Sequence, residues 1–575
     1  MSFEFLARAP LFEGLTAAEL DQLGPSMHSR TLEPGEEICR GGEPGDSLFV
    51  LVAGLAHVLA ADEAGEGRVV AKLRRGDVVG EMSLLTGEPR SATVVAALPT
   101  DVLELRQGDF AAAIGRFPVL LNNLNRILSH KLAATTAQVG VSQSRGEAIA
   151  LVAGRAAEAS QDVVAATRGA KIGAVATLDA SASLETVLAE LDDLLDDHAV
   201  VIVTARLEQE GLGGLVAAVD RTIALIQDEG ELAHVAAAIS RAGPRARADL
   251  VVIADPNEAG ATFAPRAADA TTIVRTVTAP DGVLPADDVA WLGRHLARTK
   301  LGLALGAGGA KGYAHVSLLR MLEQAGYTVD YVAGSSIGAI VGAWIGLGLD
   351  ATEIEETMRR SFREEVVAQI FKLSFGGTSS GLEVMTELLR EVTQEKAFDD
   401  LAIPLVVMAV DLVERRPAMI TEGLLWPSLL AATSVAGLFP PFERDGQRLV
   451  DGIALVPVPT DAARHAGADI TVAVNLIGRS VLPEWPGVES QPEGPKGPGS
   501  RMLETLLEVM DLAQLDSSER FTARADVAIT PQFGPCTWRD FHLADLFLEA
   551  GREAAERALP ALQALARPQL SRSPM

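Results

Sequence analysis

The chain has 575 residues and a formal net charge of −28 at pH 7, and 48% of its residues are hydrophobic although only 4% are aromatic. The length predicts about three to four domains, and the negative charge excludes binding to nucleic acid or anionic lipid by charge alone. The only cysteines, Cys39 and Cys536, exclude a disulfide framework and a cysteine-rich zinc site and fit a reducing cytosol, and we expect no metal.

Residues 1–30 lack the basic start and apolar core of a signal peptide, so we expect a cytoplasmic protein. Short apolar runs punctuated by glycine follow over residues 30–105, and this pattern predicts a small β-barrel or sandwich. Helical patterns flank these runs at 17–27 and 108–132.

A short motif lies within the predicted barrel, where Gly80-Glu81 is followed nine residues later by Arg90 and the hydroxyl of Ser91. A carboxylate can accept from a ribose hydroxyl while an arginine pairs with a cyclic phosphate. The segment resembles the phosphate-binding cassette of cyclic nucleotide-binding domains, and the resemblance covers roughly residues 8–130. It implies that Gly80, Glu81, Arg90 and Ser91 line a site for a regulatory cyclic nucleotide, cAMP or cGMP. The alternative is a ligand-free docking domain that retains a surface Glu–Arg pair.

A polar linker at 135–147 stands where a transcription factor would need a helix-turn-helix, so we expect no nucleic-acid partner. Residues 136–298 alternate apolar β-type runs with amphipathic stretches, which we interpret as helices at 183–197 and 212–228. The alternation predicts a parallel α/β sheet, and neither phosphate-loop pattern occurs in it. We interpret this region as a spacer or regulatory domain.

Two glycine-rich turns follow β-type runs in the last part of the chain. The run at 301–305 leads into the turn Gly308–Gly312, and the run at 329–333 leads into Gly334-Ser335-Ser336-Ile337-Gly338. The second turn has the G-x-S-x-G pattern of a nucleophilic serine at a sharp strand-to-helix turn. The first turn fits neither a Walker loop nor a dinucleotide fingerprint. Its glycines allow backbone N–H groups to converge on a developing negative charge, as in an oxyanion hole.

The second turn also begins a nineteen-residue uncharged run, Tyr331–Leu349, whose length would suit a bilayer crossing. A membrane helix would not begin with Gly-Ser-Ser directly after a β-type run. We therefore expect a helix buried in an α/β domain and no transmembrane segment. Contact with the inner face of a membrane would be peripheral.

A serine nucleophile needs a base, and the residues alone leave several candidates open. A Ser–His–Asp triad has three available histidines, His315, His465 and His542. Two Asp-Gly pairs also follow. Asp445-Gly446 lies in a polar segment that predicts a hairpin tip, whereas Asp451-Gly452 follows a strand end that would hold a carboxylate rigidly.

The order and spacing of GAGGAKG, GSSIG and LVDG resemble those of patatin-like phospholipases over about residues 299–560. With the N-terminal domain, the chain resembles a bacterial neuropathy target esterase-type protein. The resemblance implies that Ser336 is the nucleophile and Asp451 the base, without histidine or a catalytic cofactor, and that phospholipids or lysophospholipids are the substrates. It assigns the oxyanion region to the glycine turn, namely Gly308, Gly309, Lys311 and Gly312. The sequence departs from the family pattern at Ile453, where the family usually has Gly or Ala after Asp-Gly. This difference bears on substrate preference and rate more than on the class of reaction.

We therefore predict a multidomain chain: a cyclic nucleotide-binding β-barrel at 1–135, an α/β domain at 136–298 and an α/β patatin-like hydrolase domain at 299–575. The expected function is a serine lipid acyl hydrolase tuned by a cyclic nucleotide. The alternatives are the same hydrolase with a ligand-free N-terminal domain, and a non-catalytic lipid-binding scaffold. We also expect a mobile lip at 371–385, a surface loop at 483–500, and at 501–515 an amphipathic helix suited to the core or to a homo-oligomer.

Overall fold

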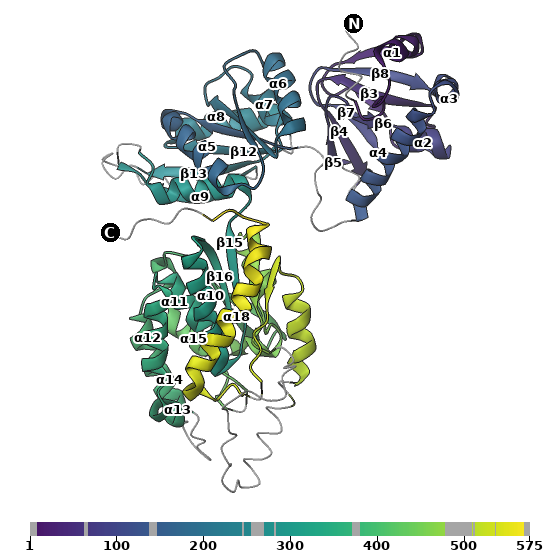
Figure 1. Cartoon of the computed structure of the whole chain (residues 1–575). Coiled ribbons are helices and arrows are strands. Elements are labelled where there is room, and N and C mark those ends of the chain that lie inside the picture. Colours follow the sequence, from purple (N-terminus) through teal and green to yellow (C-terminus); the bar gives the residue numbers. More distant parts are fainter. Residues whose placement is uncertain are drawn as a thin grey trace. The chain divides into compact units, whose positions relative to one another are not determined.

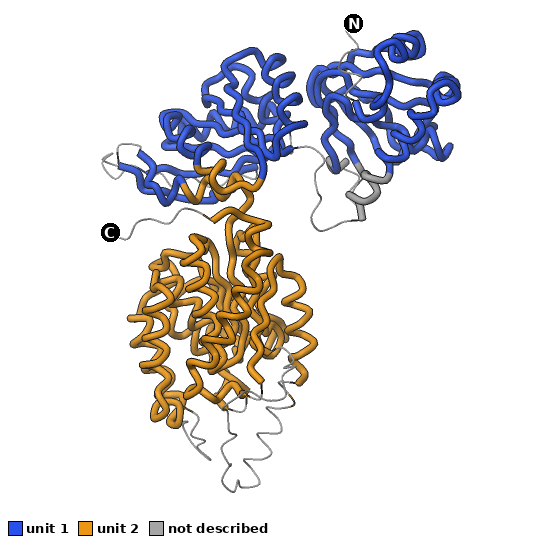
Figure 2. Tube along the Cα trace, in the orientation of Figure 1, with its two compact units in different colours: residues 1–165, 173–289 blue, residues 166–172, 290–575 orange. Residues whose placement is uncertain are grey.

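The computed structural model divides the chain into two compact units, Met1–Ala165 with Gly173–Val289 and Ala166–Ile172 with Ala290–Met575 (Figure 2). The domain boundaries at 135 and 298 remain predictions. The predicted loop at 483–500 lies outside the described residues, as do most of the lip at 371–385 and of the helix at 501–515. The described residues are 9–61, 67–136, 146–243, 246–254, 270–280, 283–370, 380–436, 438–477, 509, 512–534 and 536–568.

The predicted N-terminal barrel is confirmed as two antiparallel four-stranded sheets, with strand orders β1-β8-β3-β6 and β2-β7-β4-β5 (Figure 1). Strand β3 is covered on both faces, because Leu48 and Val50 pack into one apolar cluster while Phe49 and Leu51 pack into another, and this accounts for its continuous apolar run. The strands are β1 (His28–Leu32), β2 (Glu37–Cys39), β3 (Ser47–Ala53), β4 (Ala56–Ala61), β5 (Gly67–Leu73), β6 (Val78–Val79), β7 (Thr93–Ala96) and β8 (Thr100–Arg106). The helices are α1 (Ala17–Leu23), α2 (Glu81–Thr86), α3 (Gln107–Arg116) and α4 (Val119–Thr136).

The parallel sheet predicted for the middle of the chain is also confirmed, with the strand order β10-β11-β9-β12-β13-β14. All seven residues of β9 are buried, as expected for a strand covered on both faces. The strands are β9 (Glu147–Ala153), β10 (Val175–Asp179), β11 (Val200–Arg206), β12 (Arg221–Ile226), β13 (Ala248–Ala254) and β14 (Thr271–Thr278).

One predicted helix in this region is wrong. The stretch 212–228 forms the short helix α7 (Leu212–Ala218) and then strand β12, which pairs with β9 and β13. A short apolar run does not distinguish a strand from a buried helix by its periodicity. The position of β12 between two other strands buries Thr222–Ile226 and decides in favour of the strand.

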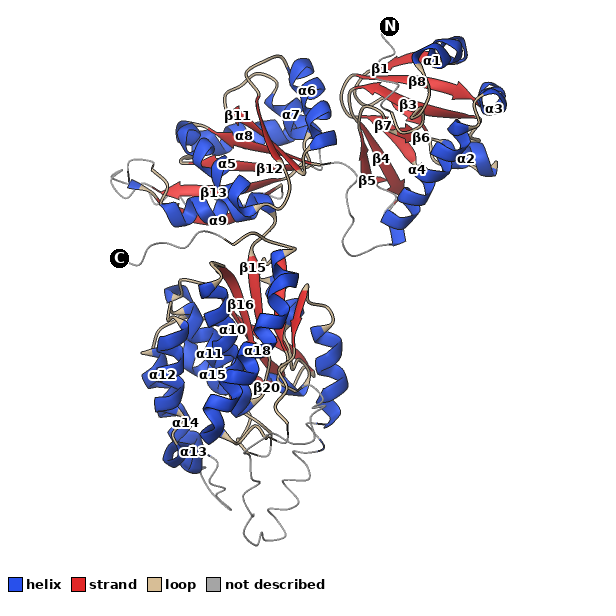
Figure 3. Cartoon of the chain, viewed as in Figure 1, coloured by secondary structure: helices blue, strands red, loops and turns tan. Residues whose placement is uncertain are grey.

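The second unit contains an eight-stranded sheet with the order β19-β20-β17-β16-β15-β21-β22, in which β18 also pairs with β17. Figure 3 shows this sheet with helices packed around it. The neighbours β17, β16, β15, β21 and β22 are parallel, so their carboxyl ends share one edge. The strands are β15 (Leu301–Leu305), β16 (Val329–Ser335), β17 (Leu405–Asp411), β18 (Arg416–Ile420), β19 (Phe442–Arg444), β20 (Gln447–Asp451), β21 (Ile470–Val474) and β22 (Val527–Ile529).

The uncharged run Tyr331–Leu349 contains the end of β16 and the ten-residue helix α11 (Ile337–Gly346). Every residue of α11 is buried, which accounts for its lack of polar side chains. In the part of the chain that the structure describes, no helix combines the length and the apolar character needed to cross a membrane.

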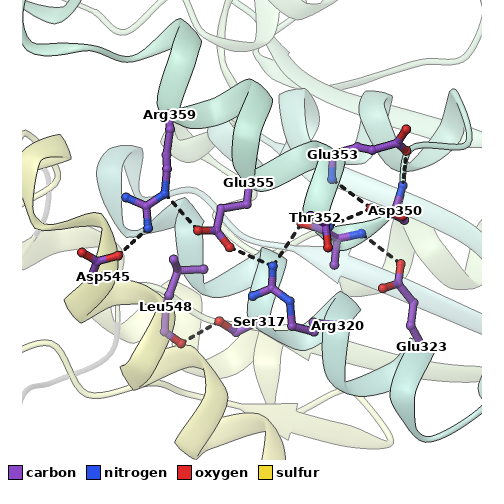
Figure 4. A network of polar contacts seen from close by, with 11 residues as sticks. Ser317, Arg320, Glu323, Asp350, Thr352, Glu353, Glu355, Arg359, Asp545 and Leu548 are labelled. Carbon is purple, nitrogen blue, oxygen red and sulfur yellow. Dashed lines mark hydrogen bonds and ion pairs between the residues drawn. The ribbon is translucent and has the colours of Figure 1, made fainter.

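A polar network joins three helices on the outside of this unit, α10 (Tyr313–Gln324), α12 (Ala351–Ser361) and α18 (Ala544–Gln563) (Figure 4). Glu355 of α12 accepts hydrogen bonds from Arg320 at 2.8 Å and Arg359 at 2.9 Å, and Arg359 also pairs with Asp545 of α18. The carbonyl of Leu548 accepts from a serine of α10. These contacts hold the three helices together.

Candidate active site

Ser336 lies at the turn between β16 and α11, as its sequence pattern predicts. Its backbone has a φ of 54° and a ψ of −123°, a region that residues other than glycine rarely adopt. Such a strained turn projects the serine hydroxyl away from the sheet, towards the carboxyl edge of the strands.

Asp451 meets this hydroxyl from the end of β20. Ser336 Oγ donates a hydrogen bond of 2.6 Å to Asp451 Oδ2, and the N–H of Ile453 donates to Oδ1 at 2.8 Å. The backbone of Asp451 is fixed by its antiparallel pairing with Ala409 and by its N–H, which donates to the carbonyl of Ser434 at 3.0 Å. Hydrogen bonds to both carboxylate oxygens, together with the fixed backbone of Asp451, therefore orient this carboxylate.

Burial changes the basicity of this carboxylate. Asp451 is 2% exposed, and the loss of solvation raises its pKa from 3.8 to about 7. The hydrogen bonds from Ser336 and Ile453 act in the opposite direction, because they stabilise the ionised form. A carboxylate with a pKa near neutrality is a much better proton acceptor than an exposed aspartate.

The glycine turn after β15 lies beside the same cavity. Gly309 has a φ of +55°, and a Cβ atom there would lie 2.4 Å from the carbonyl oxygen of Trp538. That carbonyl accepts the N–H of Ala310 at 2.8 Å, while the N–H of Lys311 donates to the carbonyl of Gly308 at 3.2 Å. Among the described residues, the backbone N–H groups of Gly308 and Gly309 have no hydrogen-bond acceptor, and both residues line the cavity.

The other two residues of the predicted oxyanion region have different surroundings. Lys311 lines the cavity, and its Nζ lies 5.5 Å from the centre of the Phe533 ring. Gly312 is buried against the side chain of Ile337, at the start of α10.

The cavity has a volume of about 380 Å³ and contains both Ser336 and Asp451. Most of its wall is apolar, so it suits a hydrocarbon chain better than a polar ligand. Residues far apart in the sequence contribute large apolar side chains to it: Ile340, Phe362, Ile370, Met385, Phe439, Leu476, Leu512, Trp538 and Phe541. Met385 is the last residue of the predicted lip and Leu512 lies in the predicted helix at 501–515, but no motif assigns any of these residues to the cavity. The only local signal was their apolar character, which they share with the core.

The three histidines that could complete a triad do not contact Ser336 as Asp451 does, among the residues that the structure describes. In the described part of the chain, the hydroxyl of Ser336 has no histidine partner. His315 is 1% exposed, and its Nε2 lies 2.9 Å from the carbonyl oxygen of Gly306. His465 and His542 are exposed.

The structure brings the predicted cyclic nucleotide residues together at one end of helix α2. Gly80 precedes this helix with a φ of 84°, and Arg90 donates to its carbonyl at 2.9 Å and to Ser47 Oγ at 3.1 Å. Glu81 and Arg90 are buried, with exposed fractions of 3% and 6%, whereas Ser91 is exposed. The guanidinium of Arg90 thus connects two other segments of the domain, at Gly80 and at Ser47.

Comparisons with known proteins agree with these two sites. Residues 303–464 match the family model of patatin-like phospholipases, and residues 29–117 match that of the cyclic nucleotide-binding domain. An NTE family protein of Mycobacterium tuberculosis is 24% identical over 98% of this chain and 97% of its own length. Human patatin-like phospholipase domain-containing protein 6 is 23% identical, over 77% of this chain and 37% of its own length. Drosophila melanogaster neuropathy target esterase sws is 23% identical over 77% of this chain and 35% of its own length.

The resemblance inferred from the motifs is confirmed over both domains. The chain therefore carries a patatin-like phospholipase domain, which indicates a lipid ester hydrolase, together with a cyclic nucleotide-binding domain, and it is similar over nearly its whole length to an NTE family protein of Mycobacterium tuberculosis.

Proposed function

We propose that the chain hydrolyses the acyl esters of phospholipids or lysophospholipids through a dyad of Ser336 and Asp451. The observation that carries this proposal is the hydrogen bond of 2.6 Å from Ser336 Oγ to a carboxylate that is buried in an apolar cavity. The pKa of Asp451, raised by burial to about 7, supports the role of general base without a histidine.

In the first half of the reaction, Ser336 Oγ attacks the ester carbonyl carbon while Asp451 accepts the hydroxyl proton. The carbonyl oxygen becomes negative, and the N–H groups of Gly308 and Gly309 stabilise it. Each such donor is typically worth ~3 kcal/mol of the barrier. The bond to the leaving alcohol then breaks, and Asp451 returns its proton to that oxygen. The product is an acyl ester of Ser336.

In the second half, water attacks the acyl carbonyl carbon, and Asp451 accepts a proton from that water. The same N–H groups stabilise the second negative oxygen. The bond to Ser336 Oγ breaks, the fatty acid leaves, and Asp451 returns the proton to Oγ. No residue other than the dyad transfers a proton.

The substrate class follows from the cavity wall. An apolar cavity of about 380 Å³ favours an acyl chain, and burial of each methylene contributes roughly 0.8 kcal/mol. Such substrates reside in membranes, so peripheral contact with a lipid surface is part of the proposal.

Labelling with a fluorophosphonate probe tests the nucleophile directly. We expect the wild type to be labelled at Ser336 and to hydrolyse long-chain acyl esters, and Ser336→Ala to lose both properties. Ser335→Ala is the matched control, because Ser335 is fully buried and its hydroxyl has no partner among the described residues. A folded wild type that neither reacts with the probe nor hydrolyses esters would favour the scaffold alternative.

We also propose that a cyclic nucleotide binds beside Arg90 and regulates the hydrolase. The buried guanidinium supports this proposal, because it has five N–H donors and its hydrogen bonds to Gly80 and Ser47 leave others for a cyclic phosphate. Calorimetry with cAMP and cGMP tests it, and we expect a heat of binding that disappears in Arg90→Ala. Absence of heat in the wild type would favour a ligand-free domain that serves assembly.

A further inference from the structure

The backbone between β15 and α10 is anchored at several points. The N–H of Gly306 donates to the carbonyl of Val474 at 3.1 Å, and the N–H of Ala307 donates to that of Pro457 at 2.9 Å. Further on, the N–H of Ala310 donates to the carbonyl of Trp538. The free N–H groups of Gly308 and Gly309 lie between these anchors. Their direction therefore depends on how the anchors hold the chain.

One anchor comes from a side chain, His315 on the first turn of α10. Its Nε2 lies 2.9 Å from the carbonyl oxygen of Gly306. A carbonyl oxygen only accepts hydrogen bonds, so Nε2 must carry the proton. The other ring nitrogen, Nδ1, is buried and has no partner among the described residues.

The surroundings of His315 keep its ring neutral. The residue is 1% exposed, and burial lowers its pKa from 6.5 to about 4, although the hydrogen bond to Gly306 opposes this change. A neutral ring that donates to a main-chain carbonyl is suited to hold that carbonyl in place. It is poorly suited to accept the proton of Ser336.

We propose that His315 is a positioning residue for the oxyanion hole, in which its Nε2–H group holds the Gly306 carbonyl so that the N–H groups of Gly308 and Gly309 remain directed at the reacting ester. This inference rests on the proposed function of the site. The stabilisation of the oxyanion depends on donors that are already in position, and removal of one donor typically costs about 10²–10³-fold in kcat. A displacement of about 1 Å is enough for a similar loss.

Two substitutions separate positioning from proton transfer. In His315→Leu an apolar side chain of comparable size replaces the imidazole, so the donor is removed. In His315→Gln the amide nitrogen takes the place of Nε2 and can donate to the same carbonyl, but an amide does not act as a base. His465→Leu is the matched control, because His465 is another of the three candidate triad histidines but its side chain is exposed.

Steady-state kinetics on a soluble long-chain ester, with the full chain, provide the test. We expect His315→Leu to lower kcat about 10²-fold with KM changed less than about twofold, since the apolar cavity is intact. We expect His315→Gln to recover most of this loss, and the acid limb of the pH profile to stay where it is in the wild type. His465→Leu should behave as the wild type.

Other outcomes would overturn the inference. Wild-type kcat in folded His315→Leu would show that the contact with Gly306 is dispensable. An inactive but folded His315→Gln would show that the imidazole itself transfers protons. Should His315→Leu fail to fold, the kcat and pH profile of His315→Gln decide by themselves. A wild type that does not hydrolyse esters would overturn the proposed function as well, so the two failures are distinguishable.

Discussion

The hydroxyl of Ser336 and the carboxylate of Asp451 meet at 2.6 Å although 115 residues separate them in the sequence. Ser336 follows the parallel strand β16, whereas Asp451 ends the antiparallel strand β20. The two strands are not neighbours, because β17 lies between them and pairs with both. The register of β17 therefore sets the distance between nucleophile and base.

Removal of the base should abolish hydrolysis while the fold is retained. We expect Asp451→Asn to lower kcat/KM at least about 10²-fold, since an amide does not accept the proton of Ser336. Asp445→Asn is the matched control, because Asp445 begins the other Asp-Gly pair at an exposed hairpin tip, and asparagine tolerates its φ of 50°. Activity near the wild-type level in Asp451→Asn, measured with a soluble ester, would contradict the dyad.

The dyad also predicts a pH dependence. Asp451 accepts a proton only when ionised, and its pKa in the folded chain is about 7. We expect kcat/KM to fall as the pH decreases through about 7, approaching a tenfold loss per pH unit. The measurement is a pH–rate profile of the wild type at constant ionic strength. A rate that stays constant down to pH 5 would mean that the essential base has an ordinary carboxylate pKa.

The same carboxylate should make stability depend on pH. Between its unfolded pKa of 3.8 and its folded pKa of about 7, the folded chain binds a proton that the unfolded chain does not. Stability therefore falls as the pH rises through this window, by up to about 4 kcal/mol.

Asp451→Asn lacks this titration, so its stability relative to the wild type should increase between about pH 4 and pH 8. All five tryptophans lie in the second unit, and tryptophan fluorescence during urea unfolding reports on this unit. Parallel pH dependences of the two proteins would show that the carboxylate is not desolvated.

The apolar cavity predicts that the enzyme prefers long acyl chains, and that a larger side chain in the cavity wall reduces this preference. Met385 of helix α14 (Ser380–Thr393) lines the cavity, and Met385→Trp should reduce its volume. We expect kcat/KM for a long-chain ester to fall about tenfold or more, with little change for an acetyl ester. Equal losses on both substrates would indicate damage to the fold rather than a shortened cavity.

A pair of glycine substitutions tests the cyclic nucleotide site. Gly80 and Gly87 both have positive φ, 84° and 73°, so alanine costs roughly 1–2 kcal/mol at either position. A Cβ at Gly80 would lie 2.3 Å from Arg90 Nη1, whereas Gly87 has no neighbour within 4 Å. We expect Gly80→Ala to lose the calorimetric heat of cAMP or cGMP binding and Gly87→Ala to retain it. Equal heats in both variants would exclude Arg90 from the site.

Much of the fold follows from local patterns in the sequence. The uninterrupted apolar runs of β3 and β9 each predict a strand, because a strand that is covered on both faces has apolar residues at successive positions. Strand β12 was predicted as a helix because its apolar run Ile223–Ile226 suits a buried helix equally well. Only its neighbours β9 and β13 decide between the two.

The sequence by itself determined the local conformations that the chemistry needs, which are glycine-containing turns after short apolar strands. Ser336 lies in one of these turns, and Asp451 directly precedes the glycine of another. Such turns depend on a few adjacent residues, so they are readable without the fold. Tertiary structure alone decided the contact between Ser336 and Asp451, the pKa of that carboxylate, and the apolar cavity to which Phe362, Trp538 and others contribute. Desolvation and shape depend on atoms brought together from distant segments, and no local pattern records them.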